Sequence, residues 1–192
     1  VNMQVLGCAY TIFKYGNEAV RKKYVEKLCT AEYIGGFGIT ESDAGSDVMA
    51  MASTAEDKGD HWLLNGSKTW ISNANVADCL LYYAYTDKAA GSKGLSAFVI
   101  EPKNFAGIKT SSLDKLGSHS SPTGELFLDN VKIPKENLLG TRWLALDADP
   151  ATDHGLQQSG HCLRLGKKLV GHRGKLGNPS PNELAVRIMI LD

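Results

Sequence analysis

The sequence predicts an α+β fold, in which an N-terminal helical hairpin is followed by an antiparallel β-barrel or two-sheet domain and then by an irregular C-terminal tail. Apolar residues recur at spacings of three and four up to about residue 28. From residue 34, short runs of β-branched and aromatic residues are separated by Gly, Asn and Asp. Neither pattern persists after residue 140, so we expect three parts, at residues 1–33, 34–140 and 141–192.

Two helices are expected in the first part. Residues 3–15 carry a stripe of apolar side chains, and Gly16 is expected to end this helix. Asn17 suits the N-cap of a second helix over residues 17–28, because its side-chain oxygen can accept a hydrogen bond from a backbone N–H that lacks a helical partner. The chain is therefore expected to open with a helical hairpin.

The second part is predicted to consist of strands. The strongest turn signal is Asn65-Gly66, which lies between two strand-like runs, and both residues tolerate the positive φ of a two-residue type I′ hairpin turn. Close spacing without intervening helices favours antiparallel pairing. The expected strands are residues 34–39, 49–55, 61–64, 68–72, 79–85, 95–101, 108–113, 124–128 and 131–133.

The composition excludes several classes of protein. The 192 residues include 21 Lys and Arg and 21 Asp and Glu, so there is no net charge to attract nucleic acid. No apolar run reaches the roughly 20 residues that would insert into a membrane, and the start of the chain lacks the layout of a signal peptide. The four cysteines are widely spaced, which predicts a reducing, cytoplasmic location and no metal site.

Two stretches could hold chemistry. Residues 37–48 read FGITESDAGSDV, so a strand leads into a loop of hydroxyl and glycine residues that could surround an anion such as a pyrophosphate. Residues 65–73 read NGSKTWISN, and alternation places Trp70 and Ser72 on one face, where they could contact a planar ring and its edge. The ordinary alternatives are a connecting loop with Asx and Ser turns and a buried core tryptophan.

Taken together, these stretches resemble the flavin-binding signatures of the acyl-CoA dehydrogenase family. The resemblance continues at residues 94–99, 115–117, 121–126 and 129–134 and covers residues 3–140. Within the family, the sequence of these stretches is most similar to the glutaryl-CoA dehydrogenase branch of anaerobic bacteria. The resemblance implies that residues 1–33 are the end of the N-terminal helical domain and that residues 34–140 are the middle β-domain.

The resemblance also implies a cofactor and a set of binding residues. The cofactor is FAD, and Ser46 is expected to lie near both its pyrophosphate and the acyl-CoA. Ser92 and Lys93 stand where the family contacts the CoA moiety, and the other expected partners are electron-transferring flavoprotein and three further copies in a homotetramer. The residues that the resemblance assigns to FAD are Phe37, Ile39, Thr40, Gly45, Ser46, Trp70, Ile71 and Ser72.

The family reaction is the α,β-dehydrogenation of an acyl-CoA, in which a glutamate takes the α-proton and the β-hydrogen leaves as hydride. That glutamate belongs to a C-terminal helical domain, which nothing after Gly140 resembles, so no catalytic residue is assigned. Residues 141–192 are expected to be a frame-shifted or poorly ordered tail. The predicted function is therefore that of a short-chain or dicarboxylic acyl-CoA dehydrogenase, possibly for glutaryl-CoA, present as a fragment. The alternative is a non-catalytic flavin-binding remnant or interaction domain.

Glu41 adjoins the expected flavin loop but is interpreted as structural. Acidic residues in such loops usually accept hydrogen bonds from nearby backbone donors.

Overall fold

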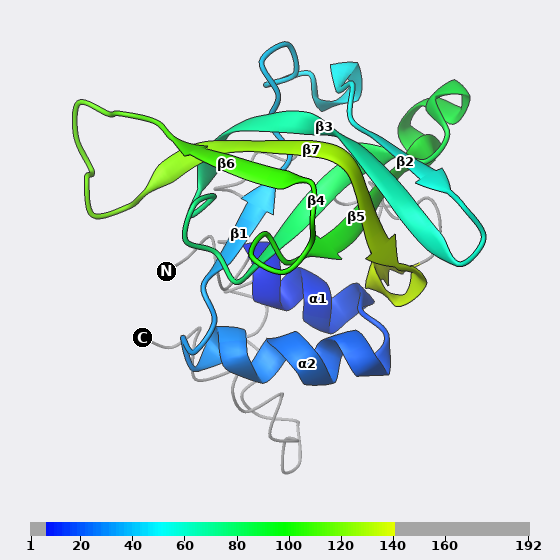
Figure 1. Ribbon diagram of the computed structural model, residues 1–192, viewed down its shortest axis with the longest axis horizontal. Helices are drawn as coiled ribbons and strands as arrows, with labels where there is room; N and C mark the ends of the chain where they lie inside the picture. The colour runs from blue at the N-terminus through cyan, green and yellow to red at the C-terminus, as the bar shows by residue number, and fades with distance from the viewer. Residues whose placement is uncertain (1–6, 141–192) are drawn as a thin grey trace, which may run out of the picture. The chain divides into compact units, whose positions relative to one another are not determined.

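The computed structural model describes residues 7–140, in which two short helices lie on one side of a sheet (Figure 1). Helix α1 covers Tyr10–Tyr15 and helix α2 covers Glu18–Cys29. The predicted tail at 141–192, and the part of the first predicted helix before residue 7, lie outside the described residues. The helix-plus-sheet architecture confirms the α+β prediction.

The predicted ends of the helices are confirmed. Gly16 follows α1, and its N–H donates to Ile12 O at 2.7 Å. A β-carbon on Gly16 would stand 2.5 Å from the same oxygen, so this turn requires glycine. Asn17 caps α2, because its Oδ1 accepts from the N–H of Val20 at 2.9 Å.

The sheet is mixed, with the strand order β6-β7-β3-β2-β4-β5-β8 and β1 paired to β4. Short 3-10 helices lie at Val48–Ala50, Lys88–Gly94 and Lys135–Asn137 and are labelled η2, η3 and η4. The strands are β1 Gly35–Gly38, β2 Thr54–Asp57, β3 His61–Ser72, β4 Cys79–Tyr85, β5 Leu95–Ile100, β6 Ile108–Ser112, β7 Thr123–Pro134 and β8 Leu138–Leu139.

The expectation of a purely antiparallel sheet is wrong. Strand β1 runs parallel to β4, and β2 meets β4 in a parallel bridge between Thr54 and Tyr85. The reason is that β2 and β3 lie between β1 and β4 in the sequence. The connection is therefore long enough for the chain to enter β4 in the same direction as β1. Over the residues that the structure describes, the strand order is open, and closure into a barrel is not confirmed.

The predicted hairpin turn at Asn65-Gly66 is also wrong. These two residues lie inside β3, where Asn65 pairs with Thr54 and Gly66 pairs with Leu128. The turn between β2 and β3 is formed instead around Gly59, whose φ is +92°, and the Lys58 N–H donates to His61 O at 3.0 Å. The Asn-Gly pattern correctly indicates a positive φ, because Gly66 has a φ of +137°, but this residue lies within a strand and not in a turn.

Other boundaries shift for related reasons. The predicted strand at 49–55 is divided between η2 and β2. The predicted strands at 124–128 and 131–133 are one strand, β7, interrupted at Asn130 by a bulge that faces Asn65. Asn130 has a φ of +49°, and Oδ1 of Asn65 accepts its N–H at 2.7 Å.

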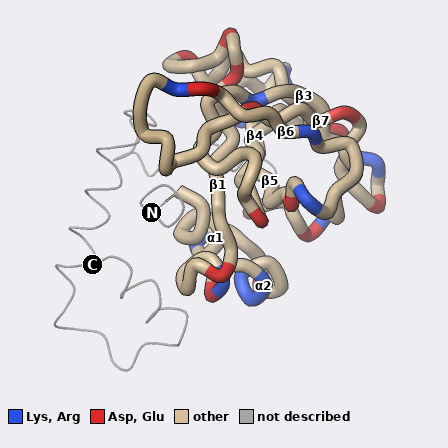
Figure 2. The backbone as a smooth tube through the Cα atoms, turned by 60° about the vertical axis from the view of Figure 1, so that its left-hand side comes forward, with Lys and Arg blue, Asp and Glu red and all other residues tan. Residues whose placement is uncertain are grey.

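The main core lies between the long strands. Its apolar side chains include Trp62 and Phe98, whose rings meet edge to face with centroids 5.4 Å apart. Basic and acidic residues are interspersed along the described backbone (Figure 2). None of the helices described is long and apolar enough to cross a membrane.

Candidate functional site

The two stretches singled out from the sequence lie side by side. The N–H of Thr69 on β3 donates to the carbonyl oxygen of Thr40 at 2.9 Å, so the loop that follows β1 is joined to β3 one residue before Trp70. Two of the residues assigned to FAD, Thr40 and Trp70, are therefore brought near each other by the bond between Thr40 and Thr69.

Trp70 is displayed on the surface by a β-bulge. Lys68 pairs with Leu126 and Ile71 pairs with Gly124, so β3 advances three residues where β7 advances two. The extra residue reverses the alternation of faces: Lys68 and Ile71 are both buried, whereas Trp70 between them is 61% exposed. The core interpretation of Trp70, favoured by pattern alone, is wrong because alternation cannot anticipate a bulge.

The backbone at Trp70 is also unusual. Its φ is +59°, a left-handed conformation that costs a side-chain-bearing residue about 1–2 kcal/mol. Residues other than glycine with left-handed backbone cluster at active and ligand-binding sites, so the conformation of Trp70 suits a binding site. Ser72 is half-buried on the same strand, and the side chain of Ile71 belongs to the core, at 2% exposure.

The loop after β1 has a closed base and an open tip. Glu41 and Ala44 exchange two backbone hydrogen bonds, of 3.0 and 3.2 Å. Beyond them, Gly45 and Ser46 are exposed, and a β-carbon added to Gly45 would meet nothing within 4 Å. The tip at Gly45 and Ser46 therefore offers a hydroxyl and backbone groups on an exposed part of the loop, with open space beside Gly45.

The other predicted residues of this stretch lie deeper. Ile39 is buried, Thr40 is half-buried, and the Phe37 ring packs on the ring of Tyr83 with centroids 5.0 Å apart. Ser92 and Lys93 lie in η3, the exposed connection that leaves β4 after Tyr85. The Tyr85 hydroxyl donates to Met49 O at 2.9 Å, which joins this end of β4 to η2, just after Ser46.

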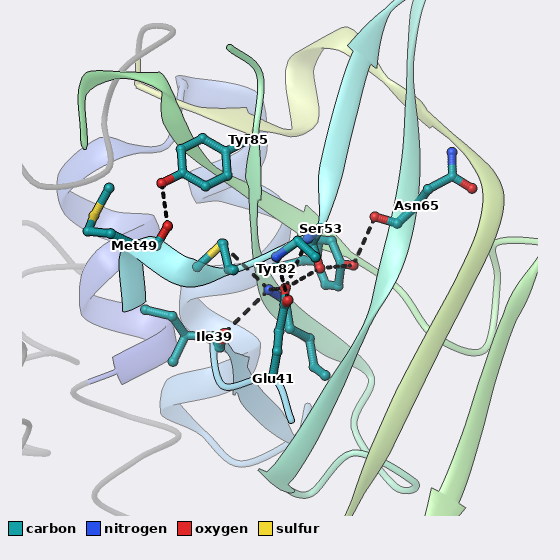
Figure 3. A network of polar contacts seen from close by, with 10 residues as sticks. Ile39, Glu41, Met49, Ser53, Asn65, Tyr82 and Tyr85 are labelled. Carbon is teal, nitrogen blue, oxygen red and sulfur yellow. Dashed lines mark hydrogen bonds and ion pairs between the residues drawn. The ribbon is translucent and has the colours of Figure 1, made fainter. Parts of the chain in front are cut away.

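Beneath this surface lies a buried polar network around Glu41 (Figure 3), whose partner in an ion pair is Lys68. The Lys68 ammonium, with its side chain fully buried, lies 2.6 Å from Glu41 Oε1 and 3.3 Å from the carbonyl oxygen of Ile39. The same carboxylate accepts from the N–H of Ala52 at 2.6 Å and from the hydroxyl of Ser53 at 2.5 Å. Glu41 therefore accepts hydrogen bonds from nearby backbone donors, as its structural interpretation expects.

The network extends to β4. The Tyr82 hydroxyl donates to Ser53 Oγ at 3.0 Å, and the Lys68 ammonium lies 5.1 Å from the centroid of the Tyr82 ring. Gly66 makes room for this arrangement, because a β-carbon there would stand 2.3 Å from Ser53 Oγ. Gly66 of the Asn-Gly pair therefore allows the segment before β2 to approach β3 closely, and the pair does not form the predicted turn.

Burial and pairing act in opposite directions on these groups. Burial lowers the pKa of Lys68 to about 8, although the Glu41 carboxylate opposes this shift. For Glu41, burial alone would raise the pKa, but hydrogen bonds from Ala52, Lys68 and Ser53 outweigh it and the pKa is lowered. At neutral pH the pair is therefore ionised.

Lys68 was not identified from the sequence, although a signal was present. Trp62 and Leu64 alternate as the inward residues of β3, and the same alternation places Lys68 on the inward face. A lysine on the buried face of a strand requires an acidic partner.

Comparison with known proteins gives consistent matches over this region. The family described as "Acyl-CoA dehydrogenase, middle domain" matches residues 36–131. The glutaryl-CoA dehydrogenase of Desulfococcus multivorans is 81% identical over 140 residues, which cover 73% of this chain and 36% of that protein. A solved structure of a glutaryl-CoA dehydrogenase in complex with glutaryl-CoA superposes with a TM-score of 0.74 at 79% identity, covering 75% of this chain and 36% of the other.

A more distant relative aligns over a longer segment. The mitochondrial isovaleryl-CoA dehydrogenase of rice is 37% identical over 187 residues, covering 90% of this chain and 44% of that protein. An alignment of that extent includes residues beyond 140, the part expected to be a frame-shifted or poorly ordered tail. The chain spans about a third to a half of the length of the relatives it matches.

Proposed function

Because the chain belongs to the acyl-CoA dehydrogenase family, we propose that it forms the FAD-binding middle part of an enzyme that dehydrogenates a short-chain or dicarboxylic acyl-CoA. The observation that carries this proposal is the outward display of Trp70 on a strained bulge, joined by a hydrogen bond to the open loop at residues 40–46. An aromatic plane beside a loop of hydroxyl and backbone donors has the two features that a flavin dinucleotide requires.

The residues present fit FAD in their chemistry. The loop tip at Gly45 and Ser46 provides donors for a pyrophosphate, with free space where a β-carbon would be. Trp70 provides a surface for the ring system, and the Ser72 hydroxyl and the Ile71 main chain can bind its polar edge. Phe37, Ile39 and Thr40 complete the set at the start of the loop. When bound, FAD supplies the acceptor for the hydride that leaves the substrate.

For the substrate, we propose glutaryl-CoA first. The 81% identity to a glutaryl-CoA dehydrogenase supports this choice. Ser46, Ser92 and Lys93 would contact the CoA moiety, and Tyr85 and η2 keep the two loops that carry them at the same end of β4. By family membership, the assembly would be a cytoplasmic homotetramer that passes electrons to electron-transferring flavoprotein.

The glutamate that takes the α-proton is not assigned to any residue of this chain. Glu41 is a poor substitute, because it is buried and already accepts four hydrogen bonds. This observation favours a second candidate, a flavin-binding remnant or interaction domain without the chemistry. Reading the encoding DNA in the other frames after residue 140 would distinguish the two, since a helical segment with a suitable glutamate would favour the enzyme.

Flavin binding is tested by titrating the purified chain with FAD and following the quenching of flavin fluorescence. Trp70→Ala should weaken binding by about tenfold, because a base or ring stacked on an aromatic side chain gains about 1–3 kcal/mol. Phe127→Ala is the matched control, an exposed aromatic residue on β7 that should leave the affinity unchanged. Failure of the wild-type chain to bind FAD would refute the proposal.

Chemistry is tested by anaerobic bleaching of the bound flavin with glutaryl-CoA and butyryl-CoA. We expect no rapid bleaching by this chain, since a positioned base contributes about 10²–10⁴ in rate and orientation contributes more. Rapid bleaching that Glu41→Gln abolishes, although the variant still holds FAD at saturating concentration, would show that Glu41 is a base and would contradict its structural assignment.

A further inference from the structure

Lys68 and Glu41 flank the two segments that display the flavin-site residues. Glu41 directly follows Thr40, and Lys68 stands two residues before Trp70. We propose that the buried Lys68–Glu41 ion pair is a positioning element, which fixes the loop after β1 against the bulge at Trp70 so that both are held for one ligand. This inference rests on the proposed FAD site and assigns the role to residues that lie beneath it.

The contacts of the pair join three segments of the chain. The Lys68 ammonium reaches the end of β1 through Ile39 O at 3.3 Å and the segment before β2 through the sulfur of Met51 at 3.7 Å. Glu41 holds that segment again through Ala52 and Ser53. The loop, the strand with the bulge and the segment after η2 therefore meet at one pair of charges, around the Glu41 carboxylate shown in Figure 3.

The pair acts from below and not by contact with the ligand. The Lys68 side chain has no exposed surface and that of Glu41 is 9% exposed. The effect reaches the surface through the main chain, because the N–H of Thr69, which follows Lys68, donates to the oxygen of Thr40, which precedes Glu41. The pair and this hydrogen bond form two adjacent links between the same two segments.

Stability alone does not account for a charged pair at this place. Replacing a buried ion pair with apolar residues of similar volume is often neutral or stabilising, because burying two charges has a large desolvation cost. What an ion pair adds is direction: the carboxylate oxygens of Glu41 are fixed by four donors, whereas an apolar pair could slide. A carboxylate fixed in this way holds the loop after β1 and the bulge at Trp70 in one arrangement.

The test uses the full 192-residue chain with the double substitution Lys68→Met and Glu41→Gln, which keeps size and removes both charges. Lys68→Met alone leaves a buried carboxylate unpaired and can fail to fold, so the neutral double variant is the decisive one. The matched control is Lys23→Met with Glu101→Gln, which removes the ion pair between α2 and the end of β5. FAD affinity is measured by fluorescence titration, and the exposure of Trp70 by acrylamide quenching relative to Trp70→Phe.

We expect the Lys68/Glu41 double variant to bind FAD about tenfold or more weakly, the range seen when residues that orient a site are removed, and to show altered quenching of Trp70. The Lys23/Glu101 variant should retain wild-type affinity and quenching. Wild-type affinity in the Lys68/Glu41 variant, or equal losses in both double variants, would overturn the inference. If the wild-type chain binds no FAD, the proposed function fails, and the quenching of Trp70 in the ligand-free chain alone decides the inference.

A pH profile gives an independent readout. The titratable groups that face Lys68 are Glu41 on the loop and Tyr82 on β4, and burial raises the pKa of Tyr82. Because burial lowers the pKa of Lys68 to about 8, FAD affinity should fall as the pH rises from about 7 to about 9 in the wild-type chain. The profile should be flat in the Lys68/Glu41 variant, and an identical profile in both would contradict the assignment.

Discussion

Glu41 and Glu101 are both buried carboxylates that accept hydrogen bonds from a lysine and a hydroxyl group, yet their surroundings differ. Glu41 is paired with Lys68, whose side chain is fully buried, and with Ser53. Glu101 is paired with Lys23, whose side chain is 55% exposed, and with Tyr24 on α2. The Glu101 cluster joins helix to sheet with an ammonium that water still solvates, whereas the Glu41 network lies under the candidate site with both charges away from water.

This difference distinguishes two structural roles that a buried carboxylate can have. A carboxylate with a solvated cation holds two elements together and tolerates changes in its partner. A carboxylate with a buried cation depends on its partner completely, because either charge left alone would be desolvated without compensation. The Glu41 network should therefore respond to substitution much more strongly than the Glu101 cluster.

The largest expected effect is that of Lys68→Met on stability. Removing one member of a buried ion pair typically costs about 3–5 kcal/mol, and denaturant unfolding should show a loss of this size. Lys23→Met removes the partly exposed member of the other pair and should cost about 1 kcal/mol or less. Equal losses in the two variants would mean that the two clusters do not differ in the way described.

The next effect concerns the glycine that lets Ser53 approach β3. Gly66→Ala should cost about 2–3 kcal/mol in denaturant unfolding, because its β-carbon would stand 2.3 Å from Ser53 Oγ at a φ of +137°. The control is Gly59→Ala, at a φ of +92° but with nothing within 4 Å, which should cost about 1 kcal/mol. If Gly66→Ala were as mild as the control, Ser53 would not be held in place by the network.

A smaller effect is expected in acid, where the two carboxylates should behave alike. The pKa of each carboxylate is lowered from 4.5, because hydrogen bonds and the paired lysine outweigh burial. As the pH falls below 4.5, the unfolded chain therefore binds more protons than the folded chain. The stability that each contributes is present above about pH 4.5 and is lost as the pH falls through the folded-state pKa. Glu41→Gln and Glu101→Gln should each flatten the dependence of unfolding free energy on pH in this range, and an unchanged slope in either variant would contradict the shift assigned to it.

The smallest effect has the opposite sign. Trp70→Asn should raise stability by about 1 kcal/mol, because asparagine tolerates the left-handed conformation that the φ of +59° imposes. The same variant should lose FAD affinity, which the titration described above measures. Ser67→Asn, on an exposed position of the same strand, is the control and should leave stability unchanged. A destabilised Trp70→Asn would show that the indole stabilises the bulge.

The contrast also explains how far the sequence could predict the molecule. The helical hairpin, the Asn17 cap and the strand at Cys79–Tyr85 follow from local periodicity and capping, and the structure confirms them. The direction of β1 and the continuity of β3 through Asn65-Gly66 depend on partners more than ten residues away, which local patterns do not contain. Residues 141–192 lie outside the described part of the chain, so the prediction made for them stays a prediction.

The same limit applies to the candidate site. The two stretches were found because their residue types suit a flavin and resemble a known family. The ion pair beneath them was missed because Lys68 and Glu41 are 27 residues apart, one in each stretch, and local patterns do not show that they meet. Trp70 was assigned to the flavin only through the resemblance, since periodicity favoured a place in the core; its exposure of 61% excludes the core, and its role toward FAD stays a prediction.

The bulge at Trp70 adds an exposed aromatic side chain to the sheet between two ordinary cross-strand pairs of β3 and β7. If Trp70 were deleted, Lys68 would still face Leu126 and Ile71 would still face Gly124, with one residue between the pairs on each strand. The one extra residue on β3 thus adds an exposed aromatic surface to an ordinary antiparallel ladder, and the pairs on either side of it keep their partners. A single-residue deletion is accordingly the smallest edit that could yield the same sheet with its aromatic surface erased.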